Sequence, residues 1–197
     1  MTDDNGIPLP SWPTRDITDP RELRALAHPV RFALLDLLAE GPKTATECAE
    51  LLGETPANCS YHLRQLAKYG HVIEAGGGKG RERRWSMRKE GIRWSSVEAQ
   101  DAATAALGTV LGNVVDEHRF SKWRAYSAVN ASDDPAWRAA STSMDVAVWM
   151  TPDELNAVAQ QVLDLFTPYV ERDRREEPPA EGSRLVRFFG YGWGAPR

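Results

Sequence analysis

Cysteine is scarce in this sequence, and long apolar runs are absent. The two cysteines, Cys48 and Cys59, are too few for a disulfide framework or a four-cysteine zinc site, so we expect a reducing, cytoplasmic setting. No apolar run approaches the ~20 residues that span a bilayer, so we expect no membrane-spanning segment. Residues 1–16 are acidic and proline-rich, unlike a secretory signal. With 42% hydrophobic and 26% charged residues, the 197-residue chain is typical of a soluble globular protein.

The motifs of common enzyme classes are also missing. The chain contains no G-x-S-x-G elbow and no H-E-x-x-H pair, and its four histidines are scattered. The glycine-rich run GGGKG at residues 76–80 lacks the following helix that a phosphate-binding loop needs. We therefore predict that the protein is not an enzyme and uses no cofactor.

Charge is distributed unevenly along the chain. Residues 21–95 carry a net charge of +4, whereas residues 1–20 carry −3 and residues 96–197 carry −5. Most of the positive excess lies within residues 63–93, which hold nine basic and three acidic side chains. A bounded positive region in an acidic protein favours an anionic partner, and nucleic acid is the first candidate. A solvated surface face is the alternative explanation of a charge run by itself.

The middle of the chain has the pattern of a winged helix-turn-helix domain. Capped helix starts, glycine stops and helical apolar spacing predict four helices, at about residues 20–27, 30–40, 46–53 and 56–69. A hairpin follows, with one strand at residues 71–75, the glycine-rich tip, and a second strand at residues 81–88.

The fold class that we predict is mainly α with a small β part. It comprises the winged helix-turn-helix domain, a long dimerisation helix and a C-terminal strand-helix-strand unit. Residues 1–18 are expected to be an acidic, proline-rich arm. Residues 19–95 are expected to be the DNA-binding domain, and residues 96–197 a helical dimerisation domain that could also hold an effector.

The predicted helix at residues 56–69 has two chemically different sides. At 100° per residue, Cys59, Leu63 and Leu66 form an apolar stripe, and the opposite side is polar and cationic. Arginine can pair with guanine, and asparagine or glutamine with adenine, in the major groove of DNA. This polar side and its flanks carry Ala57, Asn58, Ser60, Tyr61, Arg64, Gln65 and Lys68. The hairpin adds basic residues that suit phosphates or an adjacent minor groove, namely Lys79, Arg81, Arg83 and Arg84.

Residues 20–95 resemble the winged-helix domain of the ArsR-type bacterial transcription regulators. The stretch TPANCSYHLRQLAKYGHV, followed by GGGKGRERRW, carries the resemblance. It implies a homodimer that places the helix at residues 56–69 in the major groove of DNA, with the wing beside it. The positions that the resemblance implies close to DNA are Thr55, Ala57, Asn58, Ser60, Tyr61 and Arg64. The rest of the chain resembles the longer members found in high-GC Gram-positive bacteria.

Metal sensing, for which this family is known, is not predicted here. Thr44 and Thr46 occupy the positions that correspond to the thiolate motif of those sensors. Cys48 and Cys59 correspond to apolar core positions, and we expect both to be small buried hydrophobic residues. Residues 116–118 resemble the Asp-x-His start of a second sensor class, but the remaining ligands of that class are missing. We therefore predict no metal site.

The C-terminal half differs from the middle of the chain in composition and in apolar spacing. Residues 96–131 lack proline and are rich in alanine, and their three-four apolar spacing predicts a helical seam with a second copy. The seam residues that we expect are Leu107, Leu111, Val114 and His118. Residues 144–150 and 185–193 have the pattern of strands on either side of a capped helix, which suggests a βαβ crossover. Eleven of the 17 aromatic residues lie in residues 96–197, where they could line a pocket for a small organic effector or form the core of a small domain.

These features together predict a sequence-specific DNA-binding transcription regulator. We expect a repressor that acts as a homodimer on an inverted repeat of double-stranded DNA, open to control by a small organic effector. The alternative is a winged-helix module that binds a partner protein and has no specific DNA readout.

Overall fold

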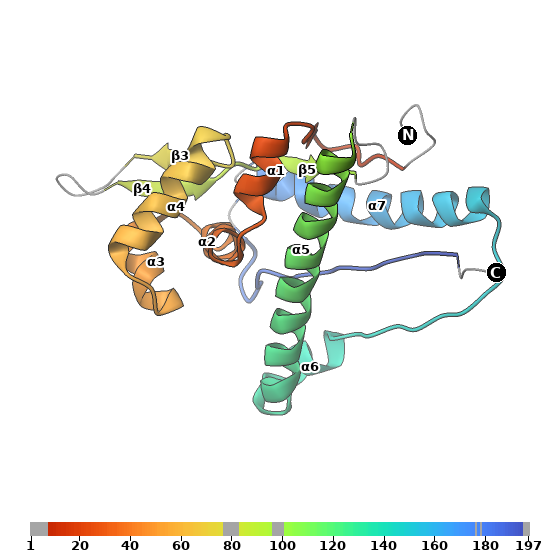
Figure 1. Cartoon of the computed structure of the whole chain (residues 1–197). Coiled ribbons are helices and arrows are strands. Elements are labelled where there is room, and N and C mark those ends of the chain that lie inside the picture. The colour runs from red at the N-terminus through yellow and green to blue at the C-terminus, as the bar shows by residue number, and fades with distance from the viewer. Residues whose placement is uncertain (1–7, 77–82, 96–100, 176, 178, 195–197) are drawn as a thin grey trace. The chain divides into compact units, whose positions relative to one another are not determined.

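The computed structural model describes residues 8–76, 83–95, 101–175, 177 and 179–194 (Figure 1). The chain divides into two compact units. The first consists of Arg15–Tyr126 and the second of the remaining N-terminal and C-terminal residues. The predicted positions Lys79 and Arg81 lie outside the described residues.

Four short helices form the first part of the unit Arg15–Tyr126. They are α1 (Pro20–Leu26), α2 (Pro29–Ala39), α3 (Ala45–Leu52) and α4 (Pro56–Lys68). Each begins at a residue whose side chain accepts a hydrogen bond from a backbone N–H of the first turn, and α1, α2 and α4 have proline at the start. Gly53 ends α3 in the left-handed conformation, with a φ of 68°, which glycine adopts without a steric penalty. The predicted order of helices is therefore confirmed.

Two small sheets complete this unit. β2 (Lys43–Thr44), β4 (Arg84–Met87) and β3 (Val72–Ala75) form an antiparallel sheet in the order β2-β4-β3, in which Val72 pairs with Met87 and Ala75 with Arg84. The hairpin β3–β4 is the predicted wing. β1 (Thr14–Asp16) and β5 (Gly91–Arg93) form a second, two-stranded sheet that the sequence did not predict. Ile17 is part of the core, so residues 15–18 belong to the folded unit and not to a separate arm as predicted.

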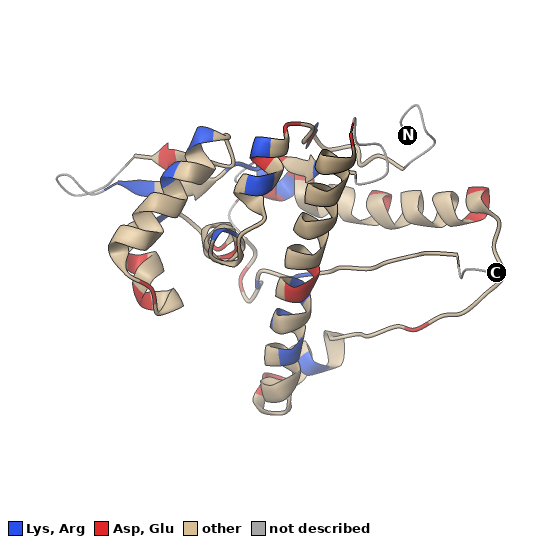
Figure 2. Cartoon of the chain, viewed as in Figure 1, with Lys and Arg blue, Asp and Glu red and all other residues tan. Residues whose placement is uncertain are grey.

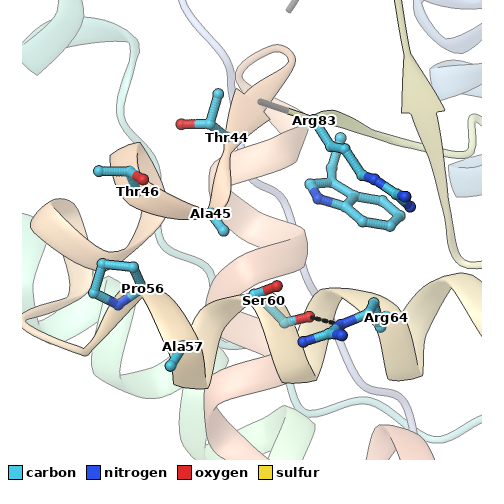
Figure 3. A pocket seen from close by; sticks show the side chains of 9 residues that line it. Thr44, Ala45, Thr46, Pro56, Ala57, Ser60, Arg64 and Arg83 are labelled. Atoms are coloured by element: carbon cyan, nitrogen blue, oxygen red, sulfur yellow. Dashed lines mark hydrogen bonds between the residues drawn. The ribbon is translucent and has the colours of Figure 1, made fainter. Parts of the chain in front are cut away.

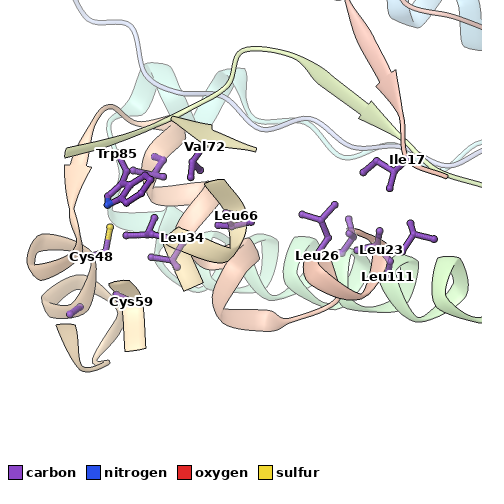
Figure 4. Packing of buried hydrophobic residues seen from close by; sticks show 14 residues of the cluster. Ile17, Leu23, Leu26, Leu34, Cys48, Cys59, Leu66, Val72, Trp85 and Leu111 are labelled. Carbon is purple, nitrogen blue, oxygen red and sulfur yellow. The ribbon is translucent and has the colours of Figure 1, made fainter. Parts of the chain in front are cut away.

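The hydrophobic core of this unit runs along α1, α2 and α4 to the long helix α5 (Ala102–Val129) (Figure 4). Leu34, Leu63 and Leu66 are fully buried where the helix-turn-helix meets the wing. Leu23 and Leu111 are buried at the α5 end of the same core. Because an apolar core of this kind stabilises a domain through the area it removes from water, α5 is an integral part of the unit. The compact unit thus extends to Tyr126, beyond the boundary that we expect at residue 95.

The predicted seam on α5 faces its own chain. Leu111 has no exposed surface, and Leu107 packs against the core. His118 Nε2 lies 2.6 Å from Asp36 Oδ2 of α2. Leu107, Leu111 and His118 therefore already contact their own chain. A three-four apolar spacing cannot distinguish a partner helix in the same chain from one in a second copy. Val114 is half-buried and is not part of the core.

The second unit contains η1 (Asn130–Ser132), α6 (Pro135–Ala140) and α7 (Pro152–Arg174). Residues 144–150 and 185–193 are extended but form no strand within the described part of the chain, so the predicted βαβ crossover is not formed there. Residues 185–193 contact α7 instead. The rings of Phe188 and Phe166 are 5.0 Å apart, and a Cβ added to Gly192 would lie 2.8 Å from Leu155 Cδ1. An apolar alternating pattern favours extended backbone, but it does not specify a pairing partner.

None of the described helices is both long enough and apolar enough to cross a membrane.

Candidate nucleic-acid interface

The sequence of α4 determines where the helix starts and which side it buries. Thr55 Oγ1 accepts a hydrogen bond from the Asn58 backbone N–H at 3.2 Å, and Pro56 occupies the first turn. Cys59, Leu63 and Leu66 have no exposed surface, which confirms the predicted buried stripe. The opposite side is open to solvent, with exposed residues Thr55, Ala57, Tyr61, Arg64 and Lys68 and half-buried residues Asn58, Ser60 and Gln65.

The polar side chains on this face are partly held by intrachain contacts. Arg64 Nε donates a hydrogen bond to the Ser60 carbonyl oxygen at 3.1 Å, which lays the arginine along the helix. Asn58 Nδ2 donates to Glu54 Oε2 at 2.8 Å, so this amide must exchange a partner before it contacts a base. Lys68 Nζ lies 5.5 Å from the ring centre of Tyr69. Arg64 is thus the exposed cation at the middle of the face.

A groove of about 590 Å³ opens between the start of α3, the exposed side of α4 and the wing (Figure 3). Its walls are Thr44, Ala45, Thr46, Pro56, Ala57, Ser60, Arg64, Arg83 and Trp85. Two hydroxyl residues of the first turn of α3 and two arginines therefore border one hollow. Backbone N–H groups at a helix start and arginine side chains both favour anions, so the lining of the groove favours an anionic group.

Thr44 and Thr46 are groove residues that the sequence analysis did not place at the interface. Thr44 caps α3, and its backbone N–H is bound by Glu47 Oε2 at 2.6 Å in a capping box. These bonds hold the pKa of the Glu47 carboxyl below its ordinary value. The capping-box pattern was recognised in the sequence, but only as a helix start. Which side of that start faces α4 depends on how α3 and α4 pack.

The two described arginines of the wing differ in their exposure and in their contacts. Arg83 Nη1 forms an ion pair with Glu74 Oε1 of the neighbouring strand, and both groups are exposed. Arg84 Nη2 donates to the Pro42 carbonyl oxygen at 2.6 Å, so Arg84 also anchors the strand to the loop before β2. Figure 2 shows blue residues on β4 and on the part of α4 beside it. Of the two described wing arginines, Arg83 is the more exposed and the one that lines the groove.

A cluster of buried polar side chains links α4 to α2. Arg31 Nε donates to His62 Nδ1 at 3.2 Å, and the rings of His62 and His28 are 4.4 Å apart. Burial lowers the pKa of His62 below its ordinary value, and the nearby His28 and Arg31 add to the effect. His62 is therefore neutral and acts as an acceptor for Arg31. It is a buried, structural residue and not part of the exposed face.

The two cysteines lie in the core between α3 and α4. Neither has exposed surface, which confirms their prediction as small buried residues. Burial raises the pKa of Cys48 to about 11 and also raises the pKa of Cys59. Because the thiolate is the metal ligand, both environments disfavour metal binding. Within the described residues, no three His, Cys, Asp or Glu side chains are grouped so that they could hold a metal ion.

Comparison with known proteins identifies the same region. Residues 26–72 match the family described as "Helix-turn-helix domain", which covers α2, α3 and α4. Over 66 residues the chain is 38% identical to a probable mercury resistance operon repressor of Streptomyces lividans. That match covers 34% of this chain and 53% of the relative, so it spans about half of the relative's length. The chain therefore contains a helix-turn-helix domain, and its similarity to this relative is confined to about a third of its length.

Proposed function

We propose that this protein is a sequence-specific DNA-binding transcription regulator of the ArsR type. The observation that carries the proposal is the geometry of α4, whose apolar side is locked in the core while Tyr61, Arg64 and Lys68 face solvent beside a cation-bordered groove. A rigid helix with this face can read base edges, and the groove beside it can hold a phosphate. The name of the similar Streptomyces protein supports repression as the sign of regulation. Such a regulator needs no catalytic residues, in keeping with the absence of enzyme motifs from the sequence.

We propose that the regulator acts as a homodimer on an inverted repeat. The dimer contact that we propose uses a different side of α5 from the seam predicted from the sequence. The exposed side of α5 lies about 100° from the side that holds Leu111. It carries Ala103, Ala106, Val110, Asn113 and Glu117 at three-four spacing, all exposed. Val110 is 48% exposed, and its small neighbours allow another helix to approach closely. Two copies joined here would place two α4 helices on one DNA site.

Control by a small molecule remains a prediction. The mercury named for the relative is not part of the proposal, because Cys48 and Cys59 are buried and their pKa values are raised. The aromatic residues of the second unit do not form an enclosed pocket at Trp149 and Trp193, which are 103% and 76% exposed. An organic effector would have to bind elsewhere or order these residues.

The test is selection of bound duplexes from a random DNA library by the purified full-length protein. We expect enrichment of an inverted repeat whose half-sites are about one turn of DNA, ~34 Å, apart. Binding to the enriched duplex should exceed binding to a scrambled duplex at the same salt concentration by about a thousandfold or more. If no sequence is enriched and duplexes bind only weakly at low salt, the protein-interaction module becomes the better explanation.

A further inference from the structure

The helix α7 carries an apolar stripe that no described segment of its own unit covers. Val158, Val162, Leu165 and Tyr169 are 41%, 38%, 70% and 60% exposed. At 100° per residue they fall within an arc of about 60°, so they form one continuous ridge along the helix. Among the described residues, α7 has no buried side chain at all, although it is 23 residues long. An amphipathic helix of this length is stable only when its apolar side is packed.

The rest of the unit occupies other sides of α7. Gln160 Nε2 donates to the Leu9 carbonyl oxygen at 3.2 Å, and the hydroxyls of Ser11 and Thr167 are 2.9 Å apart, so residues 9–11 lie on one side. Residues 185–193 lie on another side, through the contact of Phe188 with Phe166. The ridge lies on a third side of the helix. The unit's own segments are thus already placed, and they do not bury it.

The charges beside the ridge match a second copy of the same helix. Glu154 and Arg172 are 18 residues apart, which is about five turns, so both lie on the same flank of the ridge. The midpoint between them coincides, within one residue, with the midpoint of the ridge. In an antiparallel pair related by a two-fold axis, Val158 lies opposite Tyr169 and Val162 opposite Leu165. Glu154 of each copy then lies beside Arg172 of the other, whereas in a parallel pair the two flanks lie on opposite sides of the interface and these charges do not pair.

Two contacts already direct these charged groups. The Arg172 guanidinium carbon lies 5.6 Å from the centre of the Tyr169 ring, so the cation stays next to the ridge. Glu154 Oε2 accepts hydrogen bonds from the Thr151 backbone N–H at 2.7 Å and from its hydroxyl at 3.0 Å. These bonds hold the pKa of Glu154 below its ordinary value, and the carboxylate is charged at neutral pH.

We propose that α7 is a self-association surface, on which the α7 helices of two copies pack antiparallel along this ridge. The surface is separate from the exposed side of α5 and from the DNA-binding face of α4. It therefore adds a second contact between copies, and its existence does not depend on the proposed DNA binding.

Charge exchange between copies provides the sharpest test. A full-length Glu154→Arg variant has only arginine at the two flank positions, and an Arg172→Glu variant has only glutamate. Both should carry Val110→Glu, so that contact through α5 does not mask contact through α7. Each variant alone should associate about tenfold or more weakly than the Val110→Glu parent in sedimentation velocity. An equimolar mixture should recover the association of the parent, because each heterodimer has two opposite-charge pairs.

If Glu154→Arg weakened association only by destabilising α7, mixing the two variants would not restore association. Glu154→Arg removes half of a capping box, and that loss cannot be repaired by mixing with a second protein. A second comparison uses Leu165→Glu, which places a charge on the ridge, and Ala157→Glu, which places the same charge on an exposed site outside it. We expect Leu165→Glu to weaken association about tenfold or more with unchanged helix content, and Ala157→Glu to have little effect. The proposal is overturned if mixing has no effect, or if Leu165→Glu behaves like Ala157→Glu, since the ridge then packs within its own chain or stays open.

Discussion

Arg31 of α2 donates a hydrogen bond from Nε to Nδ1 of His62 in α4, at 3.2 Å. Both side chains are buried, with 8% and 4% of their surface exposed. Arg31 Nη1 also donates to the Ala25 carbonyl oxygen near the end of α1. One buried guanidinium thus ties α1 and α2 to the helix that carries the proposed DNA-binding face.

Replacing Arg31 by methionine should destabilise the helix-turn-helix. The methionine keeps the apolar stem, but it leaves two buried acceptors without a donor, at a cost of about 1–3 kcal/mol. Urea denaturation followed by circular dichroism measures the change. Arg24→Met is the control, because Arg24 is exposed on α1 and should change the free energy of unfolding by less than about 0.5 kcal/mol. Equal effects of the two substitutions would contradict a structural role for the Arg31–His62 bond.

Arg64 and Lys68 should contribute differently to DNA binding. Arg64→Ala should weaken binding to the selected duplex by about 1–3 kcal/mol and relax the preference at one base position, because an arginine–guanine pair is lost. Lys68→Ala should weaken binding to all duplexes alike and lower the slope of log K against log salt by about one. Fluorescence anisotropy on selected and scrambled duplexes at several salt concentrations separates the two effects. A uniform loss for Arg64→Ala would remove it from base readout.

Adjacent residues of α5 should give opposite results. Leu111 is fully buried and Val110 is 48% exposed. Leu111→Asp should unfold the unit Arg15–Tyr126, because it buries a charge without a partner in the core. Val110→Asp should leave the chain folded and shift the association equilibrium towards the monomer. Thermal melting and sedimentation velocity report the two effects, and a folded, dissociated Leu111→Asp protein would restore the seam predicted from the sequence.

Stability should fall on mild acidification because of His71. Burial, together with the nearby Arg15 cation, lowers the pKa of His71 to about 4, although Glu22 Oε1 lies 3.1 Å from its Nε2. The unfolded chain binds a proton near pH 6.5 and the folded chain only near pH 4, so the folded state loses stability as the pH falls through this window. We expect a loss of about 3 kcal/mol across the whole window.

His71→Gln is the matching variant for that measurement. It removes the titrating group, so the free energy of unfolding should depend less on pH between about 6.5 and about 4. His28 and His62, whose pKa values are also lowered by burial, remain and preserve part of the slope. An unchanged slope in His71→Gln would show that His71 does not titrate in this range.

Local sequence signals were sufficient to predict the helix-turn-helix and the wing. Thr55 followed by proline marks the start of α4, and Gly53 marks the end of α3, because caps and left-handed glycines act within a few residues of the chain. The buried and exposed sides of α4 also followed from spacing alone, since the helix turns by a constant angle per residue. The groove was not predicted. Thr46 and Arg64 meet there only because α3 and α4 pack against each other and against β4.

The sequence by itself determined the local elements of this protein, since capping, turn chemistry and apolar periodicity depend on near neighbours in the chain. It did not determine which apolar surface each element packs against. Leu111 is predicted to meet a second copy but is buried in the same core as Leu23 of α1. Residues 144–150 and 185–193 have the composition of strands but no ladder among the described residues. Hydrophobic attraction is not directional, so only the tertiary structure decided which partner buries each apolar side.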